Sequence, residues 1–259
     1  MKPSYEFIKD DTEKQFVKNV TMYLQKAEQQ YRPFFTDFYN IDWMQSMMKR
    51  YFKGISEELY TFFGGYEGAE RQMLCICPYE IQKEDYELSV LLLKVKTGIG
   101  KALTHRDYLG AILGLGIERK LIGDIVLNPQ GAYIFVNRGM VSYISSQLSG
   151  IGRYQRLEVE EVSLDDLQIE KPKTKELRAT VSSLRADAVA AACFGLSRSE
   201  CAKLVQGEKL KCNGMIASVS TAINEGDTLS LRGYGKAKLV AINGQTKKER
   251  LHITIEKYI

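Results

Sequence analysis

The sequence predicts an α+β protein with three parts: a helical and β N-terminal part, a ferredoxin-like middle domain, and a C-terminal domain of two small helices on a small sheet. Three observations predict this fold class. Apolar residues recur at helical spacing through roughly the first 55 residues. From residue 88 onward, the patterns follow the order strand, helix, strand, strand, helix, strand. In the last third of the chain, two short helical patterns precede a strong hairpin signal.

The N-terminal domain is predicted at residues 1–82. Asp11 is expected to cap a first helix, which Pro33 ends, and a second helix passes through Trp43. Two strands are then expected on either side of the glycine-rich stretch at 64–68. This stretch is not a phosphate loop, because no Gly-Lys-Ser/Thr follows it and no helix begins there.

The middle domain is predicted at residues 83–165. The apolar run Leu88–Val95 is typical of a central strand, and Thr104 opens a helix that has a carboxylate three residues further on. The βαββαβ order is the ferredoxin-like arrangement that RNA recognition modules also use. The polar linker at 163–175 then separates this domain from the C-terminal domain at 176–259.

Local signals define the C-terminal domain in more detail. Ser197, followed three residues later by a glutamate, is a capping box that starts the second helix. Strands on either side of Asn213-Gly214 are expected to form a hairpin, because both turn positions require a positive φ. A final hairpin is expected around Asn243-Gly244 and the basic residues after it.

The charge of the chain is divided unevenly. From Thr174 to the end there are 14 Lys and Arg against 8 Asp and Glu, whereas the first 173 residues hold 22 against 24. The whole positive excess therefore lies with the C-terminal domain, as expected for a nucleic-acid-binding surface. The alternative is that a lysine-rich tail merely aids solubility.

The composition excludes several other classes of protein. The five cysteines form no Cys-x-x-Cys pair, which favours buried, reduced thiols in a cytosolic protein over disulfides or zinc. The N-terminus has no apolar signal region, and no run approaches the roughly 18 apolar residues of a membrane span. We therefore expect a soluble, cytoplasmic protein without a membrane span, a metal or a cofactor.

Catalysis has little support in the sequence. His105 and His252 are the only histidines, and His105-Arg106-Asp107 invites a catalytic interpretation. Adjacent residues on a helix point in different directions, however, and no nucleophile motif accompanies them. A cluster at a helix start that binds phosphate or packs locally explains these residues more simply, so we predict that the protein is not an enzyme.

Four motifs follow one another in the C-terminal domain: Arg185-Ala186-Asp187, Ser197-Arg198-Ser199, Lys211-Cys212-Asn213-Gly214 and Gly226-Asp227. Together they resemble the RNA-binding domain named after ribosomal protein S4, although that family usually has Arg-Leu-Asp at the first motif. The resemblance implies that the capped helix and the hairpin present basic residues to structured RNA, where Arg and Lys contact phosphates. We expect the Arg198 side chain to be exposed and not needed for packing. The candidate RNA-binding residues are Arg185, Asp187, Ser197, Arg198, Ser199, Lys203, Lys209, Lys211, Asn213, Arg232 and Lys236.

Further motifs precede this domain: Gly64-Gly65-Tyr66, Ala69-Glu70-Arg71, the stretches 103–110 and 115–119, and Gly123-Asp124-Ile125. With the C-terminal domain and Thr246-Lys247-Lys248, they resemble the bacterial YlmH family over nearly the whole chain, although Glu249 stands where a glycine is expected. The resemblance implies binding to rRNA or tRNA, and action on the large ribosomal subunit in the rescue of stalled nascent chains. The candidates for a second RNA contact are Arg71, His105, Arg106 and Arg119.

Two alternatives stay open at this point. One is an RNA-modifying enzyme with an atypical site in the middle domain. The other is a protein-interaction adaptor that the C-terminal domain anchors to the ribosome.

Overall fold

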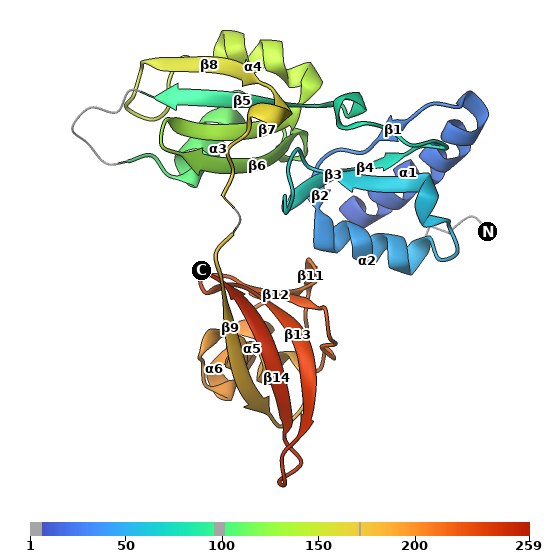
Figure 1. The fold of residues 1–259 in the computed structure, drawn as a ribbon, viewed down its shortest axis with the longest axis vertical. Helices are drawn as coiled ribbons and strands as arrows, with labels where there is room; N and C mark the ends of the chain where they lie inside the picture. Colours follow the sequence, from blue (N-terminus) through green and yellow to red (C-terminus); the bar gives the residue numbers. More distant parts are fainter. Residues whose placement is uncertain (1–6, 96–101, 171) are drawn as a thin grey trace. The chain divides into compact units, whose positions relative to one another are not determined.

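The computed structural model describes residues 7–95, 102–170 and 172–259 (Figure 1). It is a mixed α+β structure with helices and several antiparallel sheets, which confirms the α+β part of the predicted fold. None of the described helices is long and apolar enough to cross a membrane.

The chain forms two compact units, Met1–Ile169 and Glu170–Ile259. The border between them falls inside the linker that the sequence predicts at 163–175. Within the first unit, the further division into domains at 1–82 and 83–165 stays a prediction.

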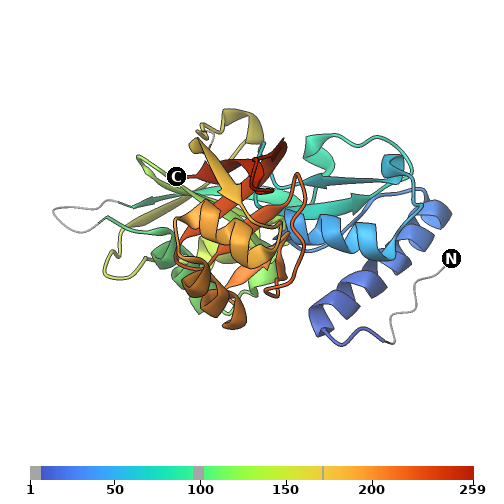
Figure 2. The same cartoon turned by 90° about the horizontal axis from the view of Figure 1, so that it is seen from below.

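The first unit begins with two helices on a small sheet. The helices α1 (Asp11–Gln30) and α2 (Ile41–Tyr51) pack against each other and against the central strand of that sheet (Figure 2). Phe16 of α1 and Met44 of α2 are fully buried there, so the apolar residues that recur at helical spacing in this part of the sequence form its core. The central strand β4 pairs with β1, β2 and β3. The strands are β1 (Phe34–Phe35), β2 (Tyr39–Asn40), β3 (Tyr60–Phe63) and β4 (Arg71–Ile76).

The cap of α1 lies one residue earlier than predicted. Asp10, not Asp11, is the N-cap residue, and its carboxylate accepts a hydrogen bond of 2.8 Å from the backbone N–H of Glu13. Asp10 has an extended backbone, as an N-cap residue requires, and Asp11 is the first helical residue.

The rest of the first unit has the predicted element order. The sheet order is β6-β7-β5-β8, and every neighbouring pair is antiparallel. Both helices pack on one face of this sheet, where Ile112 of α3 and Ile144 of α4 are fully buried with Leu91 of β5. The elements are β5 (Leu88–Val95), α3 (His105–Gly114), β6 (Ile122–Asn128), β7 (Gly131–Asn137), α4 (Val141–Gln147) and β8 (Leu157–Val162).

The second unit is a six-stranded antiparallel sheet with two helices on one face (Figure 1). The strand order is β11-β10-β12-β13-β14-β9. The helices are α5 (Ala186–Phe194) and α6 (Arg198–Gln206), and α5 is buried along almost its whole length. The strands are β9 (Thr174–Val181), β10 (Leu210–Cys212), β11 (Met215–Ile216), β12 (Thr228–Leu231), β13 (Gly235–Gln245) and β14 (Leu251–Tyr258).

Of the two Asn-Gly dipeptides in this unit, one forms the predicted turn and the other does not. Asn213 and Gly214 both have positive φ, 49° and 75°, and connect β10 to β11 as expected. The predicted final hairpin also forms, between β13 and β14, but it turns at the basic residues after Asn243-Gly244, because β13 continues through this dipeptide to Gln245. Gly244, at φ 94°, instead lies in a register shift of the β13–β14 ladder, and the hairpin turns at 246–250.

Candidate nucleic-acid interface

A buried carboxylate holds two arginines at the start of the helices of the second unit. Asp187 lies in the first turn of α5, and its side chain is only 5% exposed. Its Oδ1 accepts a hydrogen bond of 3.2 Å from Nε of Arg185, the N-cap residue of α5. Its Oδ2 accepts one of 2.7 Å from Nε of Arg198, the first residue of α6. We call these three residues the arginine cluster.

The charges of the arginine cluster depend on one another. Burial alone would raise the pKa of Asp187, but the hydrogen bonds and charges of Arg198 and Arg185 outweigh this effect and hold the pKa below its ordinary value. The two arginine side chains are 47% and 50% exposed. Each guanidinium group therefore has Nε turned toward the carboxylate, while about half of its side chain stays accessible to a ligand.

The prediction that Arg198 is exposed and unimportant for packing is therefore wrong in part. Its side chain is half-exposed, but Nε pairs with Asp187 and Nη1 lies 3.4 Å from the hydroxyl of Ser182. Asp187 is too deeply buried to contact RNA itself, so we assign it the role of positioning Arg185 and Arg198.

The capping box of α6 places two more of the candidate residues beside the arginine cluster. The carboxylate of Glu200 accepts hydrogen bonds from the backbone N–H and the hydroxyl of Ser197, and the Ser197 hydroxyl in turn accepts from the N–H of Glu200. These bonds hold the pKa of Glu200 below its ordinary value. The hydroxyl of Ser199 lies 3.2 Å from that of Ser197.

The lysines of the strands lie on the opposite face of the sheet. Leu210 belongs to the core beneath the helices, so the side chain of Lys211, the next residue, points away from them. The register pairs Lys211 with Ser230 and Ser230 with Lys236. Lys211 and Lys236 therefore share the face that α5 and α6 leave open, which we call the outer face of the sheet, and they do not lie on the helix-covered face with the arginine cluster.

The remaining candidates of this unit have separate positions. Asn213 is used internally: its Nδ2 donates to Asp227 over 2.7 Å, and its Oδ1 accepts from the N–H of Thr228. Lys203 is exposed in the last turn of α6. Lys209 and Arg232 are exposed neighbours just outside β10 and β12, joined by a backbone hydrogen bond.

In the first unit, the candidates Arg71 and Arg119 stabilise the fold. The guanidinium group of Arg71 donates to the carbonyl oxygens of Phe38, Arg119 and Ile122, and that of Arg119 donates to Ile122 and Gly123. Burial, together with the neighbouring positive charge of Arg119, lowers the pKa of Arg71. We therefore assign these two arginines a structural role.

Sequence reasoning missed the residue that holds this region together, Asp124. Its carboxylate accepts hydrogen bonds from the hydroxyl of Tyr66 and from the backbone N–H groups of Glu70 and Arg71, at 2.8, 2.7 and 3.1 Å. Burial raises its pKa in spite of these bonds. The sequence does show the motifs that contain Tyr66, Arg71 and Asp124. It does not show that the fold brings these three residues together.

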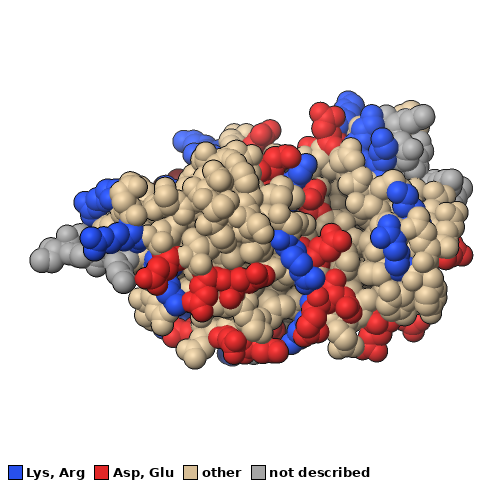
Figure 3. All heavy atoms as spheres, turned by 90° about the horizontal axis from the view of Figure 1, so that it is seen from above, with Lys and Arg blue, Asp and Glu red and all other residues tan. Residues whose placement is uncertain are grey.

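His105 and Arg106 are the two exposed candidates of the first unit, in the first turn of α3. The pKa of His105 is lowered, first by burial of its ring and then by the charge of Arg119. On the face of the molecule drawn in Figure 3, basic and acidic side chains are interspersed and form no single basic patch. Among the described residues, no group of His, Cys, Asp or Glu side chains could hold a metal ion.

Comparisons with known proteins found a family model, a curated relative and a solved structure that are similar to this chain. A family model described as "Putative RNA-binding domain in YlmH" matches residues 82–166. The "Ribosome-associated protein quality control protein P2" of Bacillus subtilis (strain 168) is 31% identical over 260 residues, covering 99% of each chain. The solved structure "Cell division protein ylmH from Streptococcus pneumoniae" is 25% identical, with a TM-score of 0.48, and covers 61% of this chain and 94% of that one.

The family model places this chain among RNA-binding proteins. Its identity to the Bacillus subtilis relative extends over nearly the full length of both chains. The chain belongs to the YlmH family.

Proposed function

We propose that this protein binds structured RNA without modifying it, on the large ribosomal subunit or on tRNA, and takes part in the rescue of stalled nascent chains. The Bacillus subtilis relative is named for ribosome-associated quality control, which supports the ribosome as the partner. The function requires a surface that contacts RNA phosphates, and the arginine cluster of the second unit is our candidate for it.

The observation that carries the proposal is the arginine cluster. Arg185 and Arg198 are held by the same buried carboxylate, so both guanidinium groups are oriented before any ligand arrives. Charge-assisted hydrogen bonds from arginine to phosphate are strong and can be bidentate, and pre-orientation lowers the entropy that binding costs. Ser197 and Ser199 add hydroxyl groups at the same helix start.

We also propose specific architectures for the two RNA-binding parts. The second unit would be an S4-type domain, which is supported by two helices on an antiparallel sheet with the four motifs at helix starts and turns. Residues 83–165 would be a ferredoxin-like domain, which is supported by the sheet order β6-β7-β5-β8 with both helices on one face.

Crosslinking followed by RNA sequencing tests the proposal, because it identifies both the RNA and the contacting unit. We expect crosslinks from the second unit to large-subunit rRNA or to tRNA, and we expect them to disappear in a variant with Arg185→Ala and Arg198→Ala. Lys175→Ala combined with Lys257→Ala is the matched control, since it removes two positive charges from the same unit but none of the candidate residues. Crosslinks that persist unchanged in the double variant would contradict the role of the arginine cluster.

The absence of catalysis is tested separately. Bound RNA is recovered after incubation with the protein, and its nucleosides are analysed by mass spectrometry. We expect no change in mass. A modified nucleoside would favour the alternative, an RNA-modifying enzyme with its site in the first unit.

A further inference from the structure

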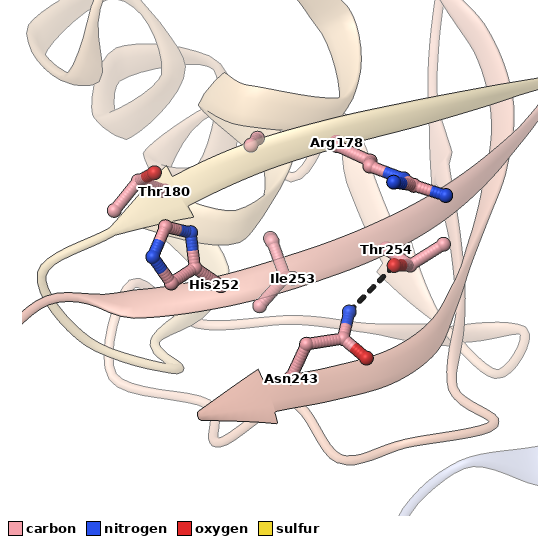
Figure 4. Close-up of a pocket in the computed structure, with 7 residues that line it drawn as sticks. Arg178, Thr180, Asn243, His252, Ile253 and Thr254 are labelled. Carbon is pink, nitrogen blue, oxygen red and sulfur yellow. Dashed lines mark hydrogen bonds between the residues drawn. The ribbon is translucent and has the colours of Figure 1, made fainter. Parts of the chain in front are cut away.

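The outer face of the second unit carries a polar groove at the end of the sheet where β9, β14 and β13 lie side by side (Figure 4). Ala179 and Ile253 pack into the core on the helix side. Side chains alternate along a strand, so their neighbours Arg178, Thr180 and His252 point to the outer face. The groove has a volume of about 420 Å³, within the range of small-ligand sites.

The groove offers several hydrogen-bond donors. The Arg178 side chain is 84% exposed; its Nε donates to Glu176 over 3.0 Å, and no described residue accepts from its terminal nitrogens. Asn243 donates from Nδ2 to Oγ1 of Thr254 over 2.6 Å. A hydroxyl group that accepts one hydrogen bond can still donate its own hydrogen, so the Thr254 hydroxyl can donate to a ligand.

The β-bulge explains why Asn243 lines this groove. In an Asn-Gly hairpin turn, Asn243 would lie at the tip of the loop. Because the shift around Gly244 lets β13 continue, Asn243 stays in the sheet beside β14. Bulges often re-aim a side chain toward a functional site.

The charges around the groove favour an anion. Arg250 borders it on one side, where its Nη2 donates to the carbonyl oxygen of Thr180 over 2.7 Å. On the other side, beyond Arg178, Glu176 faces Glu256 across the β9–β14 ladder, so an anionic ligand is favoured between Arg178 and Arg250, away from this acidic pair. The same outer face carries Lys211 and Lys236, two of the RNA-binding candidates that the sequence predicts.

We propose that this groove binds one phosphodiester of RNA, with Arg178 and His252 at the phosphate and the hydroxyl groups of Thr180 and Thr254 at the ribose. The proposal rests on the proposed function and adds a second contact, on the sheet face opposite the helices. Recognition of the ribose 2′-hydroxyl group would distinguish RNA from DNA at this position.

Binding titrations of the full-length protein with an RNA stem-loop test the proposal. Arg178→Ala combined with His252→Ala should weaken binding about tenfold, the loss expected for a charge-assisted hydrogen bond, and reduce the log–log salt slope by about 0.7–0.9 per lost phosphate contact. Glu176→Gln should strengthen binding, because it removes a carboxylate that competes for Arg178. Lys175→Ala is the matched control: it removes a charge from the same strand, but on the face that α5 and α6 cover.

The outcomes separate this proposal from the proposed function. If the wild type binds the stem-loop, the arginine-cluster variant loses binding and the groove variants match the wild type, the groove proposal is wrong while the proposed function stands. If the wild type does not bind RNA, the proposed function itself fails. Titrations with uridine monophosphate and inorganic phosphate, followed by the NMR signal of His252, distinguish the source of the phosphate. A stronger response to either small molecule than to the stem-loop would overturn the assignment to RNA.

Discussion

At the scale of single residues, Asp187 shows how a buried charge can serve a surface site. An unpaired buried carboxylate is costly, but here each oxygen accepts a hydrogen bond from a guanidinium group. The arginines therefore have two roles, because they neutralise Asp187 and present N–H groups to solvent. Replacing either arginine should change both stability and binding.

Arg198→Ala tests whether the ion pair between Arg198 and Asp187 stabilises the fold. It leaves Asp187 with Arg185 as its remaining charged partner, so we expect a loss of about 1–2 kcal/mol in the free energy of unfolding, measured with urea. The matched control is Lys203→Ala on the same helix, where the exposed side chain should contribute within about 0.5 kcal/mol. Equal stabilities of the two variants would show that the ion pair contributes nothing to folding.

The pH dependence of stability provides a second test of the same cluster. The folded-state pKa of Asp187 lies below its ordinary value of 3.8, so its ionised form stabilises the fold. This contribution is fully present above the unfolded-state pKa and is lost as the pH falls through the lower folded-state pKa. The stability difference between the wild type and Asp187→Asn should therefore be constant near neutral pH and shrink in the acidic range. A difference that grows on acidification would contradict the sign of the shift.

At the scale of elements, the sequence predicted features that local residues determine. The capping box at Ser197 and the positive-φ turn at Asn213-Gly214 depend only on neighbouring positions, and both form as predicted. The strand β9 was missed because its outer residues are polar and because the one described strand that pairs with it, β14, lies some 70 residues further along the chain. The three residues of the arginine cluster were predicted as candidates, but the ion pairs between them were not. Both arginines reach the same carboxylate only because the chain turns between α5 and α6.

Packing between elements also explains the glycine-rich stretch between β3 and β4. A Cβ atom on Gly65 would lie 2.3 Å from the ring of Phe135 on β7, whereas one on Gly68 would meet nothing within 4 Å. Both glycines have positive φ, so they differ mainly in the available space. Gly65→Ala should therefore lose about 1–3 kcal/mol more than Gly68→Ala in urea unfolding. Similar losses would show that Phe135 can move aside at little cost.

At the scale of the whole molecule, the positive charge and the exposed arginine pair both belong to the second unit, whereas the first unit has a slight acidic excess. The family model of an RNA-binding domain nevertheless matches residues 82–166 of the first unit, so RNA contacts there would depend on individual residues, and the structure narrows the candidates. Arg71 and Arg119 donate to backbone carbonyl oxygens, so changing them would disturb the fold and could not report on RNA. Arg106 is exposed and remains suitable for a test.

Arg106→Glu tests for a second contact in the first unit, and Arg156→Glu is its matched control, an exposed arginine of the same unit with the same reversal of charge. If the start of α3 touches RNA, reversing the charge at Arg106 replaces an attraction to phosphate with a repulsion. Ribosome association, measured by co-sedimentation over a series of salt concentrations, should then weaken more for Arg106→Glu than for the control. The log–log salt slope should also fall by about 0.7–0.9 for the lost contact, while the arginine cluster maintains the rest of the slope. Identical behaviour of the two variants would exclude Arg106 as an RNA contact. The salt dependence of ribosome association would then be attributed to the second unit.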